Sequence, residues 1–167
     1  GTMVREKTKM EKMLISGVAA DKNVAKIRVA GLGNDPESTF RLLNLLDRNN
    51  LNIDVMIQSL GKDGTKSVSF TVAKPDMLRT IDVLNDNKDL LGIKKLDYDE
   101  NVAKISVIGA GVRSHSGVAA KMFGALANAG INTEMVTTSE IRITALIDEA
   151  YADQAMRAIH ETFLERV

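Results

Sequence analysis

The sequence predicts an α+β protein that contains two copies of one βαββαβ unit, each an antiparallel sheet with two helices. The first observation is a repeat: residues 25–33 (AKIRVAGLG) return as residues 103–111 (AKISVIGAG), an offset of 103 − 25 = 78. The second is that each repeated strand pattern is followed by a helix pattern and two further strand patterns. The third is that the second copy has no room for its last strand before Val167.

Alternation, helix-start signals and turn residues define the elements of the first copy. Apolar and polar residues alternate over 25–31, which predicts a strand, and Asp35-Pro36 then predicts the start of a helix over about 36–49. Two strands are expected on either side of the turn residues Gly61–Gly64. These two strands span 52–60 and 66–72. A helix that starts at Lys74-Pro75, with Leu78, Ile81 and Leu84 on its apolar face, and a last strand over 91–98 complete the first copy.

The second copy repeats this order. A strand is expected over 102–109, and the spacing of apolar residues then predicts an amphipathic helix. The strands over 133–139 and 141–147 are joined by a shorter loop than in the first copy. The apolar faces of the two helices are predicted to be Val118, Met122, Ala125, Leu126 and Ala129, and Tyr151, Ala155, Ala158, Ile159 and Phe163.

The strand that the second copy lacks is expected to come from the other end of the chain. Residues 13–19 (MLISGVA) form the only strand-like segment without a place in either copy. We therefore predict that this N-terminal strand completes the second domain's sheet. The first domain would then span 23–100, and the second would combine 12–22 with 101–167.

Composition excludes several classes of function. The 22 basic residues balance 22 acidic ones and only 4% of residues are aromatic, so we expect no nucleic-acid partner. The absence of cysteine excludes disulfides, thiolate nucleophiles and zinc–thiolate sites. No apolar run approaches the roughly 20 residues that cross a bilayer, and the start of the sequence resembles no secretory or transit signal. We expect a cytoplasmic protein with no membrane partner.

Each copy carries a Gly-x-Gly element at the junction between its first strand and helix, at residues 31–33 and 109–111. The third glycine of a dinucleotide-binding motif would fall at Pro36 and at Ser114, so the spacing argues against such a site. We interpret these glycines as turn residues. The junctions also place backbone N–H groups at a helix start, where they favour an anion such as a carboxylate.

Acceptors for the ammonium group of a free amino acid are also present in the first copy. Asp35, Asn52, Asp54 and Gln58 are expected on or near the same end of the sheet. A purely structural interpretation remains open, in which Asp35 caps its helix and Asn52 and Asn132 only end loops.

The sequence offers little support for catalysis or metal binding. Ser114, His115 and Ser116 include a nucleophile and a base, but adjacent side chains do not normally face each other and no third partner is evident. His160 has no second ligand near it. We predict no catalytic residue, no metal and no cofactor in this chain.

Three motifs resemble the regulatory region of aspartate kinases. Residues 107–118 (VIGAGVRSHSGV), followed by 137–143 (TTSEIRI), are similar to the second ACT domain of that family. Residues 10–22 (MEKMLISGVAADK) and 52–58 (NIDVMIQ) are similar to the start and the first domain of the same region. The motifs occur in the family's order and spacing from about residue 10 to the end.

The resemblance implies two ferredoxin-like ACT domains that bind end-product amino acids, threonine and lysine in many members. Binding would feedback-control aspartate phosphorylation in lysine, threonine and methionine biosynthesis. ATP and Mg²⁺ would bind the kinase catalytic domain, so we expect no catalytic activity from this chain alone. The family also implies a homodimer through the ACT domains, with effectors at domain interfaces, and association with a catalytic domain or α subunit.

In some bacteria this region also exists as a separate β subunit, and Met10 resembles the internal start of such a subunit. Residues 1–11 are therefore expected to be a linker from a preceding kinase domain. The chain would then be an excised fragment of a longer protein.

The resemblance also assigns two effector sites by position. The first comprises Asp35, Pro36, Glu37, Ser38, Thr39 and Gln58, with Asn132, Thr133 and Glu134 as the facing wall. The second, a lysine-type site, comprises His115, Val118, Ala119, Ser139 and Glu140. The sequence departs from many relatives at Glu37, where they have glycine, and at Thr133, where they have an aliphatic residue. An acidic side chain at Glu37 would repel a carboxylate, so threonine affinity is the property most affected.

Two other functions share the predicted architecture. A stand-alone enzyme on this fold would need a nucleophile or an acid–base pair, which we do not find. An RNA-recognition module would need several aromatic residues on a central strand, whereas residues 66–72 contain only Phe70.

Overall fold

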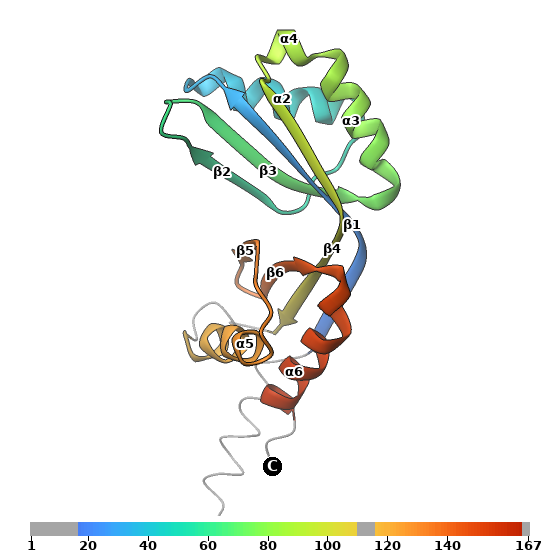
Figure 1. The fold of residues 1–167 in the computed structure, drawn as a ribbon, viewed down its shortest axis with the longest axis vertical. Coiled ribbons are helices and arrows are strands. Elements are labelled where there is room, and N and C mark those ends of the chain that lie inside the picture. The colour runs from blue at the N-terminus through green and yellow to red at the C-terminus, as the bar shows by residue number, and fades with distance from the viewer. Residues whose placement is uncertain (1–16, 110–115, 165–167) are drawn as a thin grey trace, which may run out of the picture. The chain divides into compact units, whose positions relative to one another are not determined.

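The computed structural model describes residues 17–109 and 116–164 of the chain, which divides into two compact units (Figure 1). The first domain is Asn23–Glu100, and the second domain joins Asn101–Val167 to the segment that precedes Asn23. Two long strands, β1 (Gly17–Leu32) and β4 (Lys95–Ile108), contribute residues to both domains. Both covalent connections between the domains are therefore β-strands.

The elements of the first domain follow the predicted order. The strand order is β2-β3-β1-β4, and β3 is antiparallel to β1 and to β2. Between β1 and β4 the chain forms α2 (Pro36–Arg48), β2 (Met56–Leu60), β3 (Lys66–Ala73), the 3₁₀ turn η1 (Lys74–Asp76), α3 (Met77–Asp86) and α4 (Lys88–Leu91).

The core of the first domain lies between one face of its sheet and the helices. Ile27 of β1 is the register partner of Phe70 of β3, and both are fully buried. Leu42 and Leu46 of α2 and Leu84 of α3 belong to the same cluster. The alternation along the strands and the spacing of four along α2 therefore direct these side chains into one core.

The predicted apolar face of α3 is partly wrong. Leu78 is 69% exposed, whereas Met77, Thr80 and Leu84 are buried and Ile81 packs at the edge of the core. All three predicted residues lie within α3, where one turn takes 3.6 residues, so the spacing of six places Leu78 about 120° around the helix from the buried Leu84. The Thr80 hydroxyl donates a hydrogen bond of 2.7 Å to the Asp76 carbonyl oxygen, so this buried polar group has a hydrogen-bond partner.

The second domain has the strand order β1-β4-β6-β5, and β6 is antiparallel to β4 and to β5. Its core contains Ile105 of β4, Ile143 of β6, Met122 and Leu126 of α5, and Ile159 of α6. Tyr151 was predicted to face this core but is 46% exposed, and the neighbouring Ala152 is buried instead. The further elements of this domain are α5 (Ser116–Asn128), β5 (Met135–Thr138), β6 (Arg142–Asp148), the 3₁₀ turn η3 (Glu149–Tyr151) and α6 (Ala152–Leu164).

The beginning of β1 belongs to the second domain. Val18 packs against the second domain's core, and Lys22 forms an ion pair of 3.3 Å with Asp153 of α6. The predicted fold class, α+β with an N-terminal strand that completes the second sheet, is confirmed, although residues 13–16 lie outside the described part of the chain. The sequence analysis predicted separate strands within β1 and within β4, but each is one continuous strand. The reason is that residues 20–24 and 99–101 contain no glycine or proline that would end a strand.

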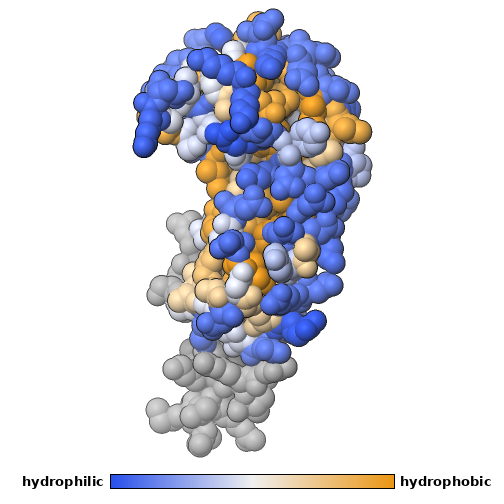
Figure 2. All heavy atoms as spheres, viewed as in Figure 1, coloured by the Kyte–Doolittle hydropathy of each residue, from blue (hydrophilic) through white to orange (hydrophobic). Residues whose placement is uncertain are grey.

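Hydrophilic residues cover much of the face shown in Figure 2, with hydrophobic residues between them. Large exposed apolar side chains include Phe40 of α2 and Leu60 of β2 in the first domain, and Val136 of β5 in the second. No helix in the part of the chain that the structure describes has the length and apolar character needed to cross a membrane.

Candidate functional site

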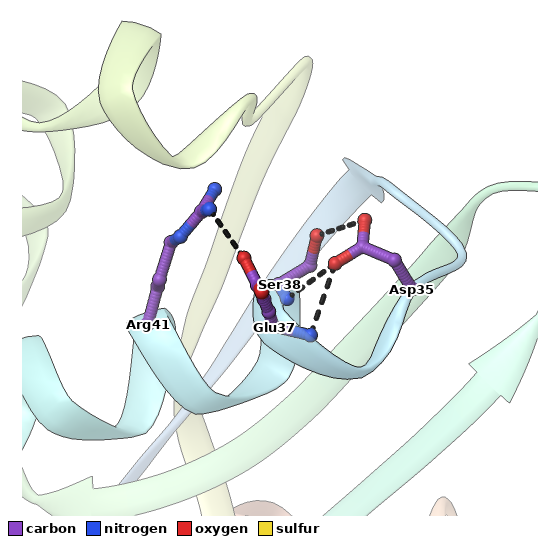
Figure 3. A network of polar contacts seen from close by, with 4 residues as sticks. All are labelled: Asp35, Glu37, Ser38 and Arg41. Carbon is purple, nitrogen blue, oxygen red and sulfur yellow. Dashed lines mark hydrogen bonds and ion pairs between the residues drawn. The ribbon is translucent and has the colours of Figure 1, made fainter.

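The Asp35 carboxylate caps α2 (Figure 3). Its Oδ1 accepts hydrogen bonds from the backbone N–H groups of Glu37 at 3.0 Å and Ser38 at 2.9 Å, and its Oδ2 accepts one from Ser38 Oγ at 2.8 Å. The Ser38 side chain and backbone bonds lower the pKa of Asp35 below its ordinary value of 3.8, and the positive charge of Arg41 adds to this effect. Asp35 is therefore a fixed, ionised carboxylate at neutral pH.

These bonds use the donors that were expected to attract an anion. Pro36 has no N–H group, and the N–H groups of Glu37 and Ser38 both point at Asp35. The expectation of free N–H groups for an effector carboxylate is therefore wrong at the start of α2. The structural interpretation of Asp35 as a helix cap is confirmed, because its own side chain lies where an external anion would bind.

Glu37 points away from this cap, along the helix. Its carboxylate forms an ion pair of 2.7 Å with Arg41, one helical turn further on, and Figure 3 shows the two side chains facing each other. Both groups are largely exposed, so this pair contributes little to stability. The pair does place the positive charge of Arg41 beside the negative charge of Glu37.

Gln58 of β2 also lies beside the first turn of α2. Thr39 Oγ1 donates a hydrogen bond of 2.6 Å to Gln58 Oε1. Lys66, at the start of β3, extends its Nζ to within 3.1 Å of the Asp35 carbonyl oxygen. Asp35, Ser38, Thr39 and Gln58 are thus brought together as predicted, and Lys66 adds a cation that the sequence interpretation missed. The position of Lys66 directly after the turn between β2 and β3 was the sequence signal that could have indicated this contact.

Asn52 and Asp54 are not part of this group. Asn52 follows the C-terminal end of α2, where the Leu51 N–H donates to the Leu46 carbonyl oxygen at 2.9 Å. A helix of 13 residues is about 20 Å long, so Asn52 lies at the opposite end of α2 from Asp35. The Asp54 N–H donates to the Thr71 carbonyl oxygen at 3.1 Å, which continues the pairing of β2 with β3.

The second-domain residues assigned to the first site lie after α5. Asn132 and Thr133 line a pocket of about 440 Å³, whose other walls are Phe123, Leu126, Ala127, Gly130 and Ile131. Glu134 does not line it, and its N–H donates to the Leu146 carbonyl oxygen at 2.8 Å. This pocket was not predicted, because no pattern in the sequence reports the space left between side chains.

The residues of the lysine-type site have different roles in the fold. Val118 and Ala119 pack into or against the core of the second domain, and Ser139 and Glu140 are exposed in the turn between β5 and β6. The Ser139 N–H donates to the Arg142 carbonyl oxygen at 2.7 Å, which closes this turn. His115 lies outside the described residues.

The described residues contain no cluster of three His, Cys, Asp or Glu side chains that could bind a metal. His160 is exposed on α6. Of the three polar residues considered for nucleophilic chemistry, Ser116 begins α5, and Ser114 and His115 lie outside the described ranges.

Comparisons with known proteins match both domains. A family model described as an ACT domain matches residues 105–163. The aspartokinase of Pseudomonas aeruginosa is 36% identical over 166 residues, which are 98% of this chain but 40% of that protein. An aspartokinase of Helicobacter pylori is 39% identical over 155 residues, or 38% of its length. The chain therefore spans about 40% of the length of the curated relatives it matches.

Solved structures of regulatory subunits match almost end to end. The ligand-free regulatory subunit of aspartate kinase from Thermus thermophilus has a TM-score of 0.85 and 32% identity, covering 90% of this chain and 99% of that one. A structure of aspartokinase alpha and beta subunits gives a TM-score of 0.83 and 41% identity, covering 89% of this chain and 98% of that one. The chain therefore belongs to the aspartate kinase family and corresponds to its regulatory part, which is built from ACT domains.

Proposed function

We propose that this chain is an allosteric module that binds an end-product amino acid, threonine or lysine or both, and thereby feedback-controls aspartate phosphorylation. The match to regulatory subunits supports the regulatory role. The observation that supports amino-acid binding most directly is the fixed Asp35 carboxylate at an exposed loop, with Gln58 and Lys66 beside it. The catalytic step, with its ATP and Mg²⁺, belongs to a kinase domain or α subunit with which this module associates.

Asp35 is the proposed acceptor for the effector's ammonium group. Three hydrogen bonds fix its orientation, and its lowered pKa keeps it negatively charged at neutral pH. Charge-assisted hydrogen bonds between an ammonium group and a carboxylate are among the stronger polar contacts in proteins. Gln58 Oε1, which now accepts the Thr39 hydroxyl, supplies a second oxygen at the same helix start.

Lys66 is the proposed partner of the effector's carboxylate. The helix start cannot serve, because Asp35 already occupies its N–H groups. Lys66 Nζ makes one described hydrogen bond, to the Asp35 carbonyl oxygen, and an ammonium group has three donors. It therefore retains capacity for a carboxylate close to the proposed ammonium acceptor.

A second copy of the chain is proposed to complete the site, with Asn132, Thr133 and Glu134 as its facing wall. The edge strands β2 and β5 and the exposed side chains of Phe40, Leu60 and Val136 are available for such an association. Binding between copies would favour one arrangement of the paired domains and so change the activity of the attached kinase.

Isothermal titration of the chain with threonine and lysine, singly and together, tests this proposal. We expect at least one of them to bind, and Asp35→Asn, which keeps an oxygen acceptor at the cap but removes its charge, to weaken that binding. Asp47→Asn, the same exchange near the other end of α2, is the matched control and should bind like the wild type. Absence of heat with both amino acids would contradict the proposed function.

A further inference from the structure

The turn between β2 and β3 contains Asp63-Gly64, the only Asp-Gly pair in a sequence that has no Asn-Gly pair. An aspartate before glycine is open to attack by the next backbone nitrogen on its side-chain carboxyl group, because glycine has no side chain to obstruct the approach. Both residues are exposed, and a Cβ atom added at Gly64 would meet nothing within 4 Å. The surroundings of this peptide bond therefore leave room for a ring and for water.

The reaction open to such a pair is isomerisation through a cyclic imide. The Gly64 nitrogen forms a bond to Asp63 Cγ, and its proton leaves with the carboxyl hydroxyl as water. Water then opens the ring at either carbonyl carbon. Opening at Cγ restores aspartate, whereas opening at the main-chain carbonyl breaks its bond to the Gly64 nitrogen. The chain then runs through Cγ as isoaspartate, with unchanged composition and one extra methylene group in the backbone.

Three hydrogen bonds oppose this reaction in the folded chain. Asp63 Oδ1 accepts the Thr65 N–H at 3.0 Å and the Thr65 hydroxyl at 2.7 Å, which holds the carboxylate toward Thr65. The Gly64 N–H donates to the Gly61 carbonyl oxygen at 3.1 Å, so the attacking nitrogen is itself engaged. Ring closure has to release the Asp63 carboxyl group from Thr65 and the Gly64 proton from Gly61.

The charge of Asp63 opposes the reaction as well. A neutral carboxyl group can lose its hydroxyl as water, whereas a carboxylate is a poor acceptor for a nucleophile. The Thr65 hydroxyl and backbone bonds lower the pKa of Asp63 below its ordinary value of 3.8, and the positive charge of Lys94 adds to this effect. The reactive neutral form is therefore rarer in the folded turn than in an unfolded chain.

Gly61 makes room for the bound carboxylate. A Cβ atom added at Gly61 would lie 2.9 Å from Asp63 Oδ1, closer than Cβ atoms come to other atoms in folded proteins. A larger residue at this position would push the Asp63 side chain out of its place. Thr65 and Gly61 thus hold the carboxylate together, one by bonding it and the other by leaving space for it.

We propose that Asp63-Gly64 is a site of isoaspartate formation in this chain, and that Thr65 suppresses the reaction by holding the Asp63 carboxylate. The inference is independent of amino-acid binding. Isoaspartate would lengthen the backbone of the turn that precedes Lys66, whose Nζ lies 3.1 Å from the Asp35 carbonyl oxygen. A change confined to one exposed turn would therefore extend to the start of α2.

Incubation of the full chain at neutral pH over several weeks tests the proposal. Mass spectrometry with electron-transfer fragmentation distinguishes aspartate from isoaspartate at residue 63. We expect isoaspartate to accumulate faster in the wild type unfolded in guanidinium chloride than in the folded wild type. Folded Thr65→Val should react about threefold or more faster than the folded wild type, which corresponds to the loss of one hydrogen bond.

Matched variants locate the effect. Thr65→Ser keeps the hydroxyl and the N–H, so it should react like the wild type. Thr138→Val, the same exchange at an exposed position of β5, should also leave the rate unchanged. Gly61→Ala crowds Asp63 Oδ1 and should accelerate the reaction without any change at Thr65. Asp63→Glu is the blank, because its longer side chain would have to close a larger ring.

The outcomes separate the site from its protection. If the unfolded wild type forms no isoaspartate at residue 63, the assigned site is wrong. A folded wild type that reacts as fast as the unfolded chain, or a Thr65→Val variant that reacts no faster than the wild type, overturns the role of Thr65. Amide resonances of the first domain show whether each variant folds, and Gly61→Ala decides the question if Thr65→Val does not. None of these results depends on whether the chain binds an amino acid.

Discussion

Asp35 combines a structural task with a chemical one at the scale of a single residue. Its carboxylate holds the first turn of α2 through three hydrogen bonds, and the same bonds lower its pKa. A pKa that is lower in the folded than in the unfolded chain means that the ionised form stabilises the fold. The stabilisation is present above the unfolded value, near 3.8, and is lost as the pH falls through the folded value.

This sign gives a testable pH dependence. The urea midpoint of the first domain should be higher for the wild type than for Asp35→Ala at neutral pH, and the difference should shrink below about pH 4 as Asp35 takes up a proton. Asp35→Asn keeps an oxygen acceptor that does not titrate, so its difference from Asp35→Ala should not change with pH. A wild-type difference that is constant down to acid pH would contradict the role of the ionised cap.

Two hydroxyl pairs between antiparallel strands, one in each domain, test how burial changes the importance of a hydrogen bond. Ser106 and Thr144 are register partners in β4 and β6, buried, with their oxygen atoms 2.9 Å apart. Ser59 and Ser67 are register partners in β2 and β3, with their oxygen atoms 2.8 Å apart. Ser59 is exposed and Ser67 is half-buried.

Removal of one hydroxyl should matter only in the buried pair. Thr144→Val leaves the Ser106 hydroxyl without its partner and should lower the free energy of unfolding of the second domain by about 1–3 kcal/mol. Ser59→Ala should change that of the first domain by less than about 0.5 kcal/mol. Urea unfolding followed through amide resonances of each domain gives both values. Equal losses in the two domains would show that burial is not the deciding factor.

At the scale of elements, one glycine within α5 and one just after its end have opposite effects. Gly124 lies on the exposed face of the helix, and a Cβ atom added there meets nothing within 4 Å. Gly130 ends the helix in the left-handed region, with φ of 74°. The first glycine therefore only weakens the helix, whereas the second supplies a conformation that other residues adopt at a cost.

Alanine at each position should move stability in opposite directions. Gly124→Ala should raise the free energy of unfolding of the second domain by about 1 kcal/mol, through helix propensity. Gly130→Ala should lower it by about 1 kcal/mol, because alanine is strained at positive φ. Urea unfolding of both variants checks the signs. A destabilised Gly124→Ala would mean that this helix face packs closely against another surface.

Local pattern in the sequence predicted most elements, because alternation and helix spacing report directly which face is buried. It failed at finer detail: the buried face of α3 carries Met77, Thr80 and Leu84 but not Leu78, and Asn52 lies a helix length from Asp35 although both flank α2. The cap at Asp35 was foreseeable from Asp35-Pro36. The Lys66 contact was not foreseeable, since it joins segments that folding brings together. The second-domain pocket was not foreseeable either, since it is the space left between the side chains of residues 123–133.

At the scale of the whole molecule, the second domain depends on residues that precede the first domain in the sequence. A chain that starts at Asn23 lacks the part of β1 that carries Val18 and Lys22. We expect its first domain to keep native amide resonances and its second domain to lose them, because β4 then lacks one neighbour. A chain that starts at Gly17 is the control. Native resonances from the second domain of the shorter chain would contradict this role of β1.

The sharing of β1 and β4 between domains also orders events during protein synthesis. Residues 17–22 leave the ribosome before the first domain, but their partners in β4 and α6 follow only after it. Domains generally fold as units while the chain emerges, so the first domain can form before the partners of this short segment have been translated. The nascent chain then presents a strand without its sheet for the time needed to translate an entire domain, and the charged residues Asp21 and Lys22 in this segment disfavour premature pairing with other chains.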